Sequence, residues 1–181
     1  MEKNVAYIAL FAALIAVLGL IPKITLAFGV PITAQSLGVM LCGTVLGAKR
    51  GGLAALLFVL LVAMGLPLLA GGRGGLGVFA SPTVGCLVGF PVAAFVTGWI
   101  VETWRSAPIG IAAGIAAVLG GVVVLYGFGV AGMAVVMGKT LPEAAALVTA
   151  FIPGDLLKAG IAGMLTASLA RARPGSVLSR A

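Results

Sequence analysis

Charge is the scarcest property of this sequence. Only 8% of its 181 residues are Asp, Glu, Lys or Arg, whereas 62% are hydrophobic. A soluble domain carries about 25% charged residues, because its surface must be hydrated. The shortage therefore excludes a soluble globular domain and predicts a protein whose exterior faces lipid.

Histidine is absent and cysteine is rare. Cys42 and Cys86 both fall in apolar segments, which makes a disulfide framework improbable. Without histidine, metal chemistry would rest on four carboxylates and two thiols, so we expect no metal and no cofactor. The chain also has no metal-ligand cluster and no Ser/Lys or Asp/Asp pair on facing helices. We therefore do not expect an enzyme.

The positive net charge of +7 does not indicate a nucleic-acid binder, because the basic residues are scattered over chain ends and loops. Two apparent nucleotide motifs also fail. Residues 72–77 satisfy G-x-G-x-x-G, but no βαβ unit surrounds them. Residues 132–140 end in GKT with five residues between the glycines, where a phosphate-binding loop needs four. The chain encodes no ATPase.

Six apolar segments account for most of the chain. A membrane-spanning helix takes about 20 residues, so six spans and their loops use the whole sequence, and we expect a single transmembrane domain over residues 1–181. The predicted spans are residues 5–21, 34–47, 52–69, 84–101, 108–132 and 153–170. The segments predicted between them are a loop over 22–33 with turn residues Gly29 and Pro31, a hinge over 48–51, a Gly-rich loop over 70–83 and a loop over 131–152, of which 144–151 lies partly in the interface.

The distribution of basic residues predicts the orientation. If both termini are cytoplasmic, seven basic residues lie inside and three outside, as the positive-inside rule requires. The inner residues are Lys3, Lys49, Arg50, Arg105, Arg171, Arg173 and Arg180, and the outer ones are Lys23, Arg73 and Lys139. All three long loops then lie outside, so we expect a binding site that faces outward.

Asp155 and Lys158 are the most informative residues, because ionisable groups within a membrane helix usually face a partner or a cavity. At a spacing of i, i+3 they share one helix face and can pair. They also occupy the first turns of the sixth predicted helix, where backbone N–H groups and the helix dipole favour anions. They could form an internal structural ion pair or line a ligand cavity, and we favour the cavity.

Small residues recur at four-residue spacing in the first predicted helix. Such stripes let helices approach closely within lipid. Ala9, Ala13 and Ala16 could therefore form a docking surface for a partner protein, or could pack inside the bundle. Glycine pairs at the same spacing, 43/47, 85/89 and 110/114, are interpreted as internal packing.

Several motifs occur together in an order that is specific even though none is diagnostic alone. They are residues 29–39 (GVPITAQSLGV), 47–51 (GAKRG), 65–67 (GLP), 70–77 (AGGRGGLG), 82–83 (PT), 89–90 (GF), 153–155 (PGD) and Lys158. On these motifs the chain resembles the BioY family, the biotin-specific substrate-binding (S) components of energy-coupling-factor (ECF) vitamin transporters. It departs from the family pattern at Ser81, where Gly is common, and at Cys86, where Tyr is common.

The resemblance implies an all-α bundle of six transmembrane helices with cytoplasmic termini that captures biotin from outside. It also implies that the first-helix alanines dock on a transmembrane coupling protein driven by paired ATPases of an ECF module. The chain would then be a multi-pass protein of the cell membrane.

The residues agree with such a ligand. Biotin has a ureido ring with two N–H donors and one carbonyl, an apolar sulfur ring and chain, and a carboxylate. Asp155 can accept a ureido N–H, and Lys158 can contact either the ureido carbonyl or the carboxylate. The other candidate contacts are Thr33, Gln35 and Ser81 for polar groups, Gly74 and Gly75 for close backbone approach, and Cys86 for apolar packing.

A self-sufficient proton- or ion-coupled carrier is the alternative function, with Asp155 as the relay. One buried carboxylate and lysine offer little for coupling, and no inverted repeat relates the two halves of the chain. We therefore prefer the hypothesis of an ECF S component to that of a self-sufficient carrier.

Overall fold

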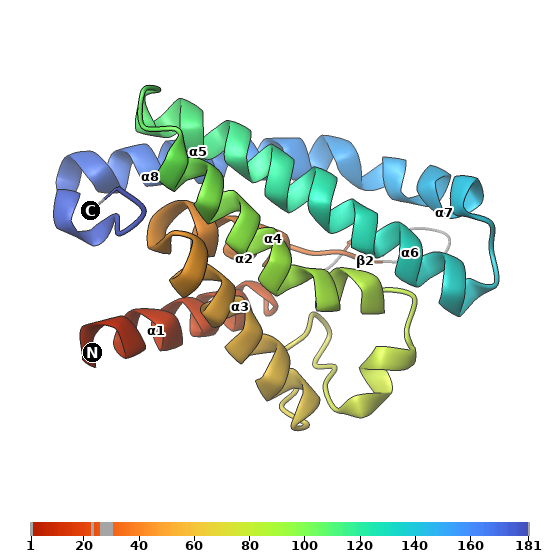
Figure 1. The fold of residues 1–181 in the computed structure, drawn as a ribbon. Helices are drawn as coiled ribbons and strands as arrows, with labels where there is room; N and C mark the ends of the chain where they lie inside the picture. Colours follow the sequence, from red (N-terminus) through yellow and green to blue (C-terminus); the bar gives the residue numbers. More distant parts are fainter. Residues whose placement is uncertain (1, 23, 26–30, 181) are drawn as a thin grey trace.

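The computed structural model describes residues 2–22, 24–25 and 31–180, and this part of the chain is almost entirely helical (Figure 1). Its α-helices are α1 (Glu2–Leu18), α2 (Gln35–Leu46), α3 (Ala48–Ala63), α4 (Val84–Thr103), α5 (Ile109–Val118), α6 (Leu125–Met137), α7 (Leu141–Val148) and α8 (Ile152–Ala172). A π-helical segment, η2 (Leu119–Val124), joins α5 to α6, and a 3₁₀ turn, η3 (Thr149–Phe151), joins α7 to α8. With each of these joined pairs counted as one helix, the described chain forms the six helices that the apolar segments predict.

Three of the six helices are long and apolar enough by themselves to cross a membrane: Val84–Thr103, Ile109–Met137 and Leu141–Ala172. The other three are shorter. Helix α2 has only 12 residues, but 11 of them are buried inside the bundle. Since α2 packs against protein on nearly all sides, it is the central helix and its length is not set by contact with lipid.

The reversal between α2 and α3 is tighter than the predicted hinge over 48–51. Gly47 alone separates the two helices, with a φ of +85° that side-chain-bearing residues rarely adopt. The first backbone N–H of α3, on Ala48, donates to the Oε1 atom of Glu102 at 2.9 Å, so α4 supplies the cap for α3. The hinge prediction was therefore too long by several residues.

Helix α3 also ends before the predicted boundary at residue 69. It stops at Ala63 because Gly65 takes a positive φ of +106° and Pro67 cannot continue a helix. The segment from 64 to 83 then forms one long excursion that contains a 3₁₀ helix, η1 (Leu76–Ala80).

The region predicted as a loop over 131–152 is mostly helical. Helix α6 continues to Met137 and ends where Gly138 adopts the left-handed conformation. Helix α7 begins directly afterwards, where the backbone N–H and the hydroxyl of Thr140 both donate to Glu143 Oε2 at 2.8 Å. The glycine and the polar residues of this region therefore end one helix and cap the next instead of forming a long loop.

The glycine pairs pack inside the bundle, as predicted. A Cβ atom at Gly85 would meet the backbone of α6 at Phe128, and one at Gly110 would meet the side chain of Ala167 in α8. Gly43 abuts the backbone of α4 at Ala94. These close approaches let helix backbones pack at short distance, which is how apolar helices gain dispersion energy in lipid.

Both ends of the described chain lie at the same end of the bundle, together with the α2–α3 junction and the α4–α5 loop (Figure 1). The predicted loop over 22–33 contains a short antiparallel pair, β1 (Ile24–Thr25) and β2 (Pro31–Ile32), so Pro31 lies in a strand rather than a turn. Lys23 and the predicted turn residue Gly29 lie outside the described residues.

Candidate functional site

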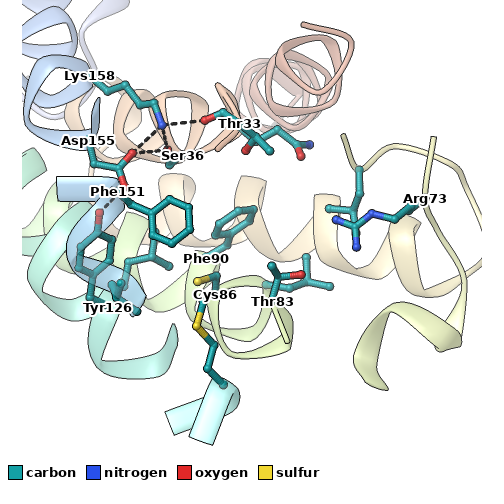
Figure 2. Close-up of a pocket in the computed structure, with 16 residues that line it drawn as sticks. Thr33, Ser36, Arg73, Thr83, Cys86, Phe90, Tyr126, Phe151, Asp155 and Lys158 are labelled. Carbon is teal, nitrogen blue, oxygen red and sulfur yellow. Dashed lines mark hydrogen bonds and ion pairs between the residues drawn. The ribbon is translucent and has the colours of Figure 1, made fainter. Parts of the chain in front are cut away.

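A cavity lies where the N-terminal parts of α2, α4 and α8 meet α6 (Figure 2). Its volume is about 100 Å³, whereas a single water needs about 10–15 Å³ on this measure. The space is therefore larger than a packing defect. Its walls include charged, hydroxyl, thiol and aromatic side chains, a mixture that fits a small amphipathic ligand.

Asp155 and Lys158 lie on one wall of this cavity and form an ion pair. Lys158 Nζ is 2.6 Å from Asp155 Oδ1, and their side chains are 15% and 8% exposed. Lys158 also donates to the Thr33 carbonyl at 2.7 Å and to Ser36 Oγ at 3.0 Å. The predicted pairing of the two residues is confirmed, and all three Lys158 donors have protein acceptors.

Two hydroxyl groups complete the surroundings of the Asp155 carboxylate. Ser36 Oγ donates to Asp155 Oδ1 at 3.1 Å, and the Tyr126 hydroxyl donates to Oδ2 at 2.6 Å. An ionised carboxylate can accept about four hydrogen bonds. With Lys158 as the third donor, Asp155 keeps room for about one more, on the Oδ2 side, and a ligand donor could use it.

Apolar side chains form the middle of the cavity. Phe90 comes from α4 and Phe151 from the η3 turn, with Cys86 beside Phe90 (Figure 2). Fully buried Phe58 supports Phe90 from behind, with ring centroids 6.3 Å apart. Phe90, Phe151 and Tyr126 thus provide the aromatic surface of the cavity, whereas Cys86 contributes only a thiol.

Arg73 lies on the other side of the cavity from the Asp155–Lys158 pair (Figure 2). Its segment is held by two backbone hydrogen bonds with Leu69, at 3.0 and 3.3 Å. Arg73 Nε makes one long hydrogen bond to the Ala70 carbonyl, at 3.4 Å. No carboxylate of the described chain lies within ion-pair distance of its guanidinium. The cavity therefore has a second cation at the end opposite the ion pair.

Thr33 and Gln35 both line the cavity, but their hydrogen bonds give them different positions in the site. Thr33 holds Lys158 through its backbone carbonyl. The Gln35 amide accepts from Ala70 N at 3.1 Å and donates to the Leu68 carbonyl at 3.0 Å and the Ile15 carbonyl at 3.3 Å. Gln35 therefore ties α1 and the 68–70 segment to the start of α2.

Gly74, Gly75 and Ser81 do not line the cavity. A Cβ atom at Gly74 would collide with the Leu66 carbonyl, so the backbone makes a close approach to protein there. Gly75 has a positive φ of +79° and precedes η1. Ser81 Oγ donates to the Val78 carbonyl at 2.6 Å and lies 3.1 Å from Thr83 Oγ1. These three residues shape the loop, and Thr83 faces the cavity in their place.

Sequence reasoning missed Ser36, Arg73, Tyr126, Phe90 and Phe151 as cavity residues. Tyr126 carried a usable signal, because a tyrosine inside an apolar span needs a hydrogen-bond partner for its hydroxyl. Ser36 directly follows Gln35, a predicted site residue. For Arg73 and the two phenylalanines the sequence holds no signal, because their convergence depends on how distant segments pack.

The predicted alanines of the first helix differ in their exposure. Ala9 and Ala13 are exposed on α1, and Ala16 is half-buried against the core. Ala12 is buried and packs inside the bundle. The exposed part of the stripe is therefore the pair Ala9 and Ala13.

Apolar helices that enclose a polar cavity, with a buried ion pair inside a span-length helix, define an integral membrane protein with a small-molecule site. The chain belongs to the BioY family, whose model matches residues 2–175. The family resemblance seen in the sequence is thereby confirmed.

Individual relatives match this chain over nearly all of its length. A protein named biotin transporter BioY from Rhodobacter capsulatus is 53% identical, covering 99% of this chain and 100% of its own length. Another of that name, from Rhizobium etli, is 52% identical over 90% of both chains. The crystal structure of an S-component for biotin from an ECF-type ABC transporter matches with a TM-score of 0.88 at 29% identity, covering 94% of this chain and 92% of that one.

Proposed function

We propose that this protein is the biotin-binding subunit of an ECF transporter, which captures biotin at the outer face of the cell membrane and delivers it inward with an ATP-driven module. The observation that carries the proposal is the cavity itself. It presents a carboxylate–lysine network at one end, aromatic side chains in the middle and an arginine at the other end. As a transporter subunit, the chain is not an enzyme.

The order of groups along the cavity matches the order of groups along biotin. Asp155 Oδ2 has capacity for one more donor, which suits a ureido N–H. Phe90 and Phe151 suit the sulfur ring and the aliphatic chain. Arg73 suits the carboxylate, since a guanidinium pairs with a carboxylate in bidentate geometry.

This pose favours one of the two roles left open for Lys158. All three of its donors are already committed to Thr33, Ser36 and Asp155. Holding the ligand carboxylate would require Lys158 to leave at least one of these buried acceptors, which costs about 1–3 kcal/mol for an unsatisfied group. Arg73 needs no such rearrangement. Lys158 therefore belongs to the ureido end.

Biotin binding by the isolated protein tests the proposed function. Detergent-purified protein, without ATP and without an ion gradient, is expected to bind one biotin per chain, measured by isothermal titration calorimetry. Heptanoate is the control, because it has a carboxylate and an apolar chain but no ureido ring, and it should bind at least about 100-fold more weakly, as expected when a site's buried polar groups are left unpaired. Binding that appears only when a coupling ion is added would favour the coupled carrier.

The proposed topology places both termini in the cytoplasm. We expect a cysteine at Gly77 to react with a membrane-impermeant maleimide in intact cells, and one at Gly175 to be protected, in a background without Cys42 and Cys86. Both glycines are exposed and have open space where a side chain would go. The opposite labelling pattern would overturn the orientation.

The proposed docking surface on α1 predicts a separation of assembly from binding. Replacing Ala13 with Trp should reduce co-purification with the coupling module by roughly fivefold or more, because close helix approach in lipid requires small residues. Biotin affinity should stay within about twofold, since Ala13 is exposed and outside the cavity. Ala131→Trp, at an exposed alanine of α6, is the matched control. If Ala13→Trp abolishes biotin binding as well, the residue is part of the internal packing.

A further inference from the structure

A second cavity lies at the end of the bundle that holds the termini, away from the ligand site. Its volume is about 610 Å³. Its walls come from the start of α1, the α2–α3 junction, the C-terminal part of α4 and the chain's C-terminal tail. None of its lining residues belongs to the first cavity. The proposed function therefore leaves this space unexplained.

Hydrogen bonds hold the walls of this cavity in place. Ser179 in the tail donates through its backbone N–H to the Val45 carbonyl at 3.0 Å and through its hydroxyl to the Thr44 carbonyl at 2.6 Å. The Arg180 guanidinium donates to the Trp104 carbonyl at 2.9 Å. The tail thus joins the end of α2 to the end of α4, and Glu102 joins α4 to α3 through Ala48.

The lining is strongly basic. Lys49, Arg50 and Arg105 line the cavity with a single carboxylate, Glu102. One oxygen of Glu102 caps α3, and in the described part of the chain the only ion pair is Lys158–Asp155. The three cations of the second cavity therefore have no carboxylate partner there, and the site favours an anion.

The same cavity has an apolar side. Trp99 and Phe95 lie one turn apart on α4, and they are 54% and 45% exposed. Trp99 lies one turn before Thr103, at the end of a span-length helix, which is where tryptophan concentrates at membrane interfaces. A soluble anion would use the cations and leave this aromatic surface bare. A lipid would use both.

We infer that this cavity binds the phosphate head group of an anionic membrane lipid, with Lys49, Arg50 and Arg105 around the phosphate and its acyl chains along Phe95 and Trp99. Arginine and lysine are the usual partners of phosphate oxygens, and basic pockets between helix ends at the cytoplasmic face suit anionic head groups. The bound lipid would bridge α3 and α4 beside the tail. This inference is independent of whether biotin is the transported ligand.

Quenching of Trp99 fluorescence tests the inference directly. Purified Trp104→Phe protein, in which Trp99 is the remaining tryptophan, is titrated in detergent with phosphatidylglycerol carrying brominated acyl chains, and in parallel with brominated phosphatidylcholine. We expect phosphatidylglycerol to reach half-quenching at a concentration at least about tenfold lower. Replacing Lys49 and Arg50 with Gln should raise that concentration by about 25-fold, the effect of two basic groups near anionic lipid.

Matched variants separate a built site from general attraction. Arg171→Gln with Arg173→Gln removes two basic residues predicted for the same membrane face but outside the cavity, and should change the half-quenching concentration by less than about threefold. Arg105→Gln is a second variant in the lining. Equal loss in the 171/173 control, or no preference for phosphatidylglycerol, would overturn the inference.

Two other occupants give different results. If glycerol phosphate displaces the brominated lipid at equal concentration, the site recognises soluble phosphate and not a lipid. If lipid preference is absent but Lys49→Gln with Arg50→Gln prevents co-purification with the coupling module, the cavity is a protein interface. Either result would refute a lipid site.

Discussion

Replacing Asp155 with Asn is expected to weaken biotin binding by about 5- to 150-fold while the protein still folds. The change removes the acceptor proposed for a ureido N–H and leaves an amide that must also face the donors of Tyr126 and Ser36. Loss of a buried hydrogen bond costs about 1–3 kcal/mol, and a tenfold change in affinity corresponds to about 1.4 kcal/mol. Calorimetry on the purified variant measures the loss.

A loss of stability alone must be distinguished from this effect. Neutralising one member of a fully buried ion pair costs about 3–5 kcal/mol of folding stability, and the cost should be lower here because Lys158 keeps the Thr33 carbonyl and Ser36 as acceptors. Thr166→Val is the matched control. It removes another buried hydrogen-bonding group on α8, a hydroxyl that bonds the Ala162 carbonyl at 2.7 Å and Thr44 Oγ1 at 2.9 Å and lies outside the cavity lining. It should lower the unfolding temperature and leave biotin affinity unchanged.

The outcome that refutes the site assignment is simple. If Asp155→Asn and Lys158→Met both stay folded and bind biotin with parental affinity, the pair is an internal ion pair with no ligand role. Biotin binding by the parent protein would then still support the proposed function, because that test does not depend on these two residues.

Replacing Arg73 with Gln is expected to weaken biotin binding by about 10- to 150-fold, with almost no effect on biotin methyl ester. A hydrogen bond to a charged group contributes about 1.5–3 kcal/mol, and the ester lacks the charge that Arg73 is proposed to hold. The ester should therefore bind the parent protein about as weakly as biotin binds the Arg73→Gln variant. Competition against radiolabelled biotin measures both ligands in one assay.

Lys158→Met provides the complementary comparison. If Lys158 serves the ureido end, biotin and its ester should lose affinity by the same factor. Lys139→Gln, which removes another basic residue of the predicted outer face outside the cavity, controls for general electrostatic attraction. A result in which Lys158→Met affects biotin far more than the ester, and Arg73→Gln affects them equally, would exchange the two assignments.

The sequence by itself determined the class, the number of helices and the pairing of Asp155 with Lys158. Hydropathy predicts lipid-facing helices because charged groups are costly in hydrocarbon, whatever the arrangement of those helices. The pairing of Asp155 with Lys158 is equally local, since a spacing of i, i+3 places both on one face of a helix. The family motifs added biotin as the expected ligand, and a relative 53% identical carries the name biotin transporter BioY.

Only the tertiary structure decided which residues surround that pair. Tyr126, Ser36 and Arg73 are distant in sequence from Asp155 and reach the same cavity because α2, α6 and the loop after α3 converge there. The same packing turned Gly74 toward Leu66 and committed Gln35 to the backbone. The start of α3 also depends on a distant residue, because Glu102 of α4 accepts the hydrogen bond of its first backbone N–H, on Ala48. Contacts of this kind depend on three-dimensional distance, which hydropathy and motif spacing along one chain do not contain.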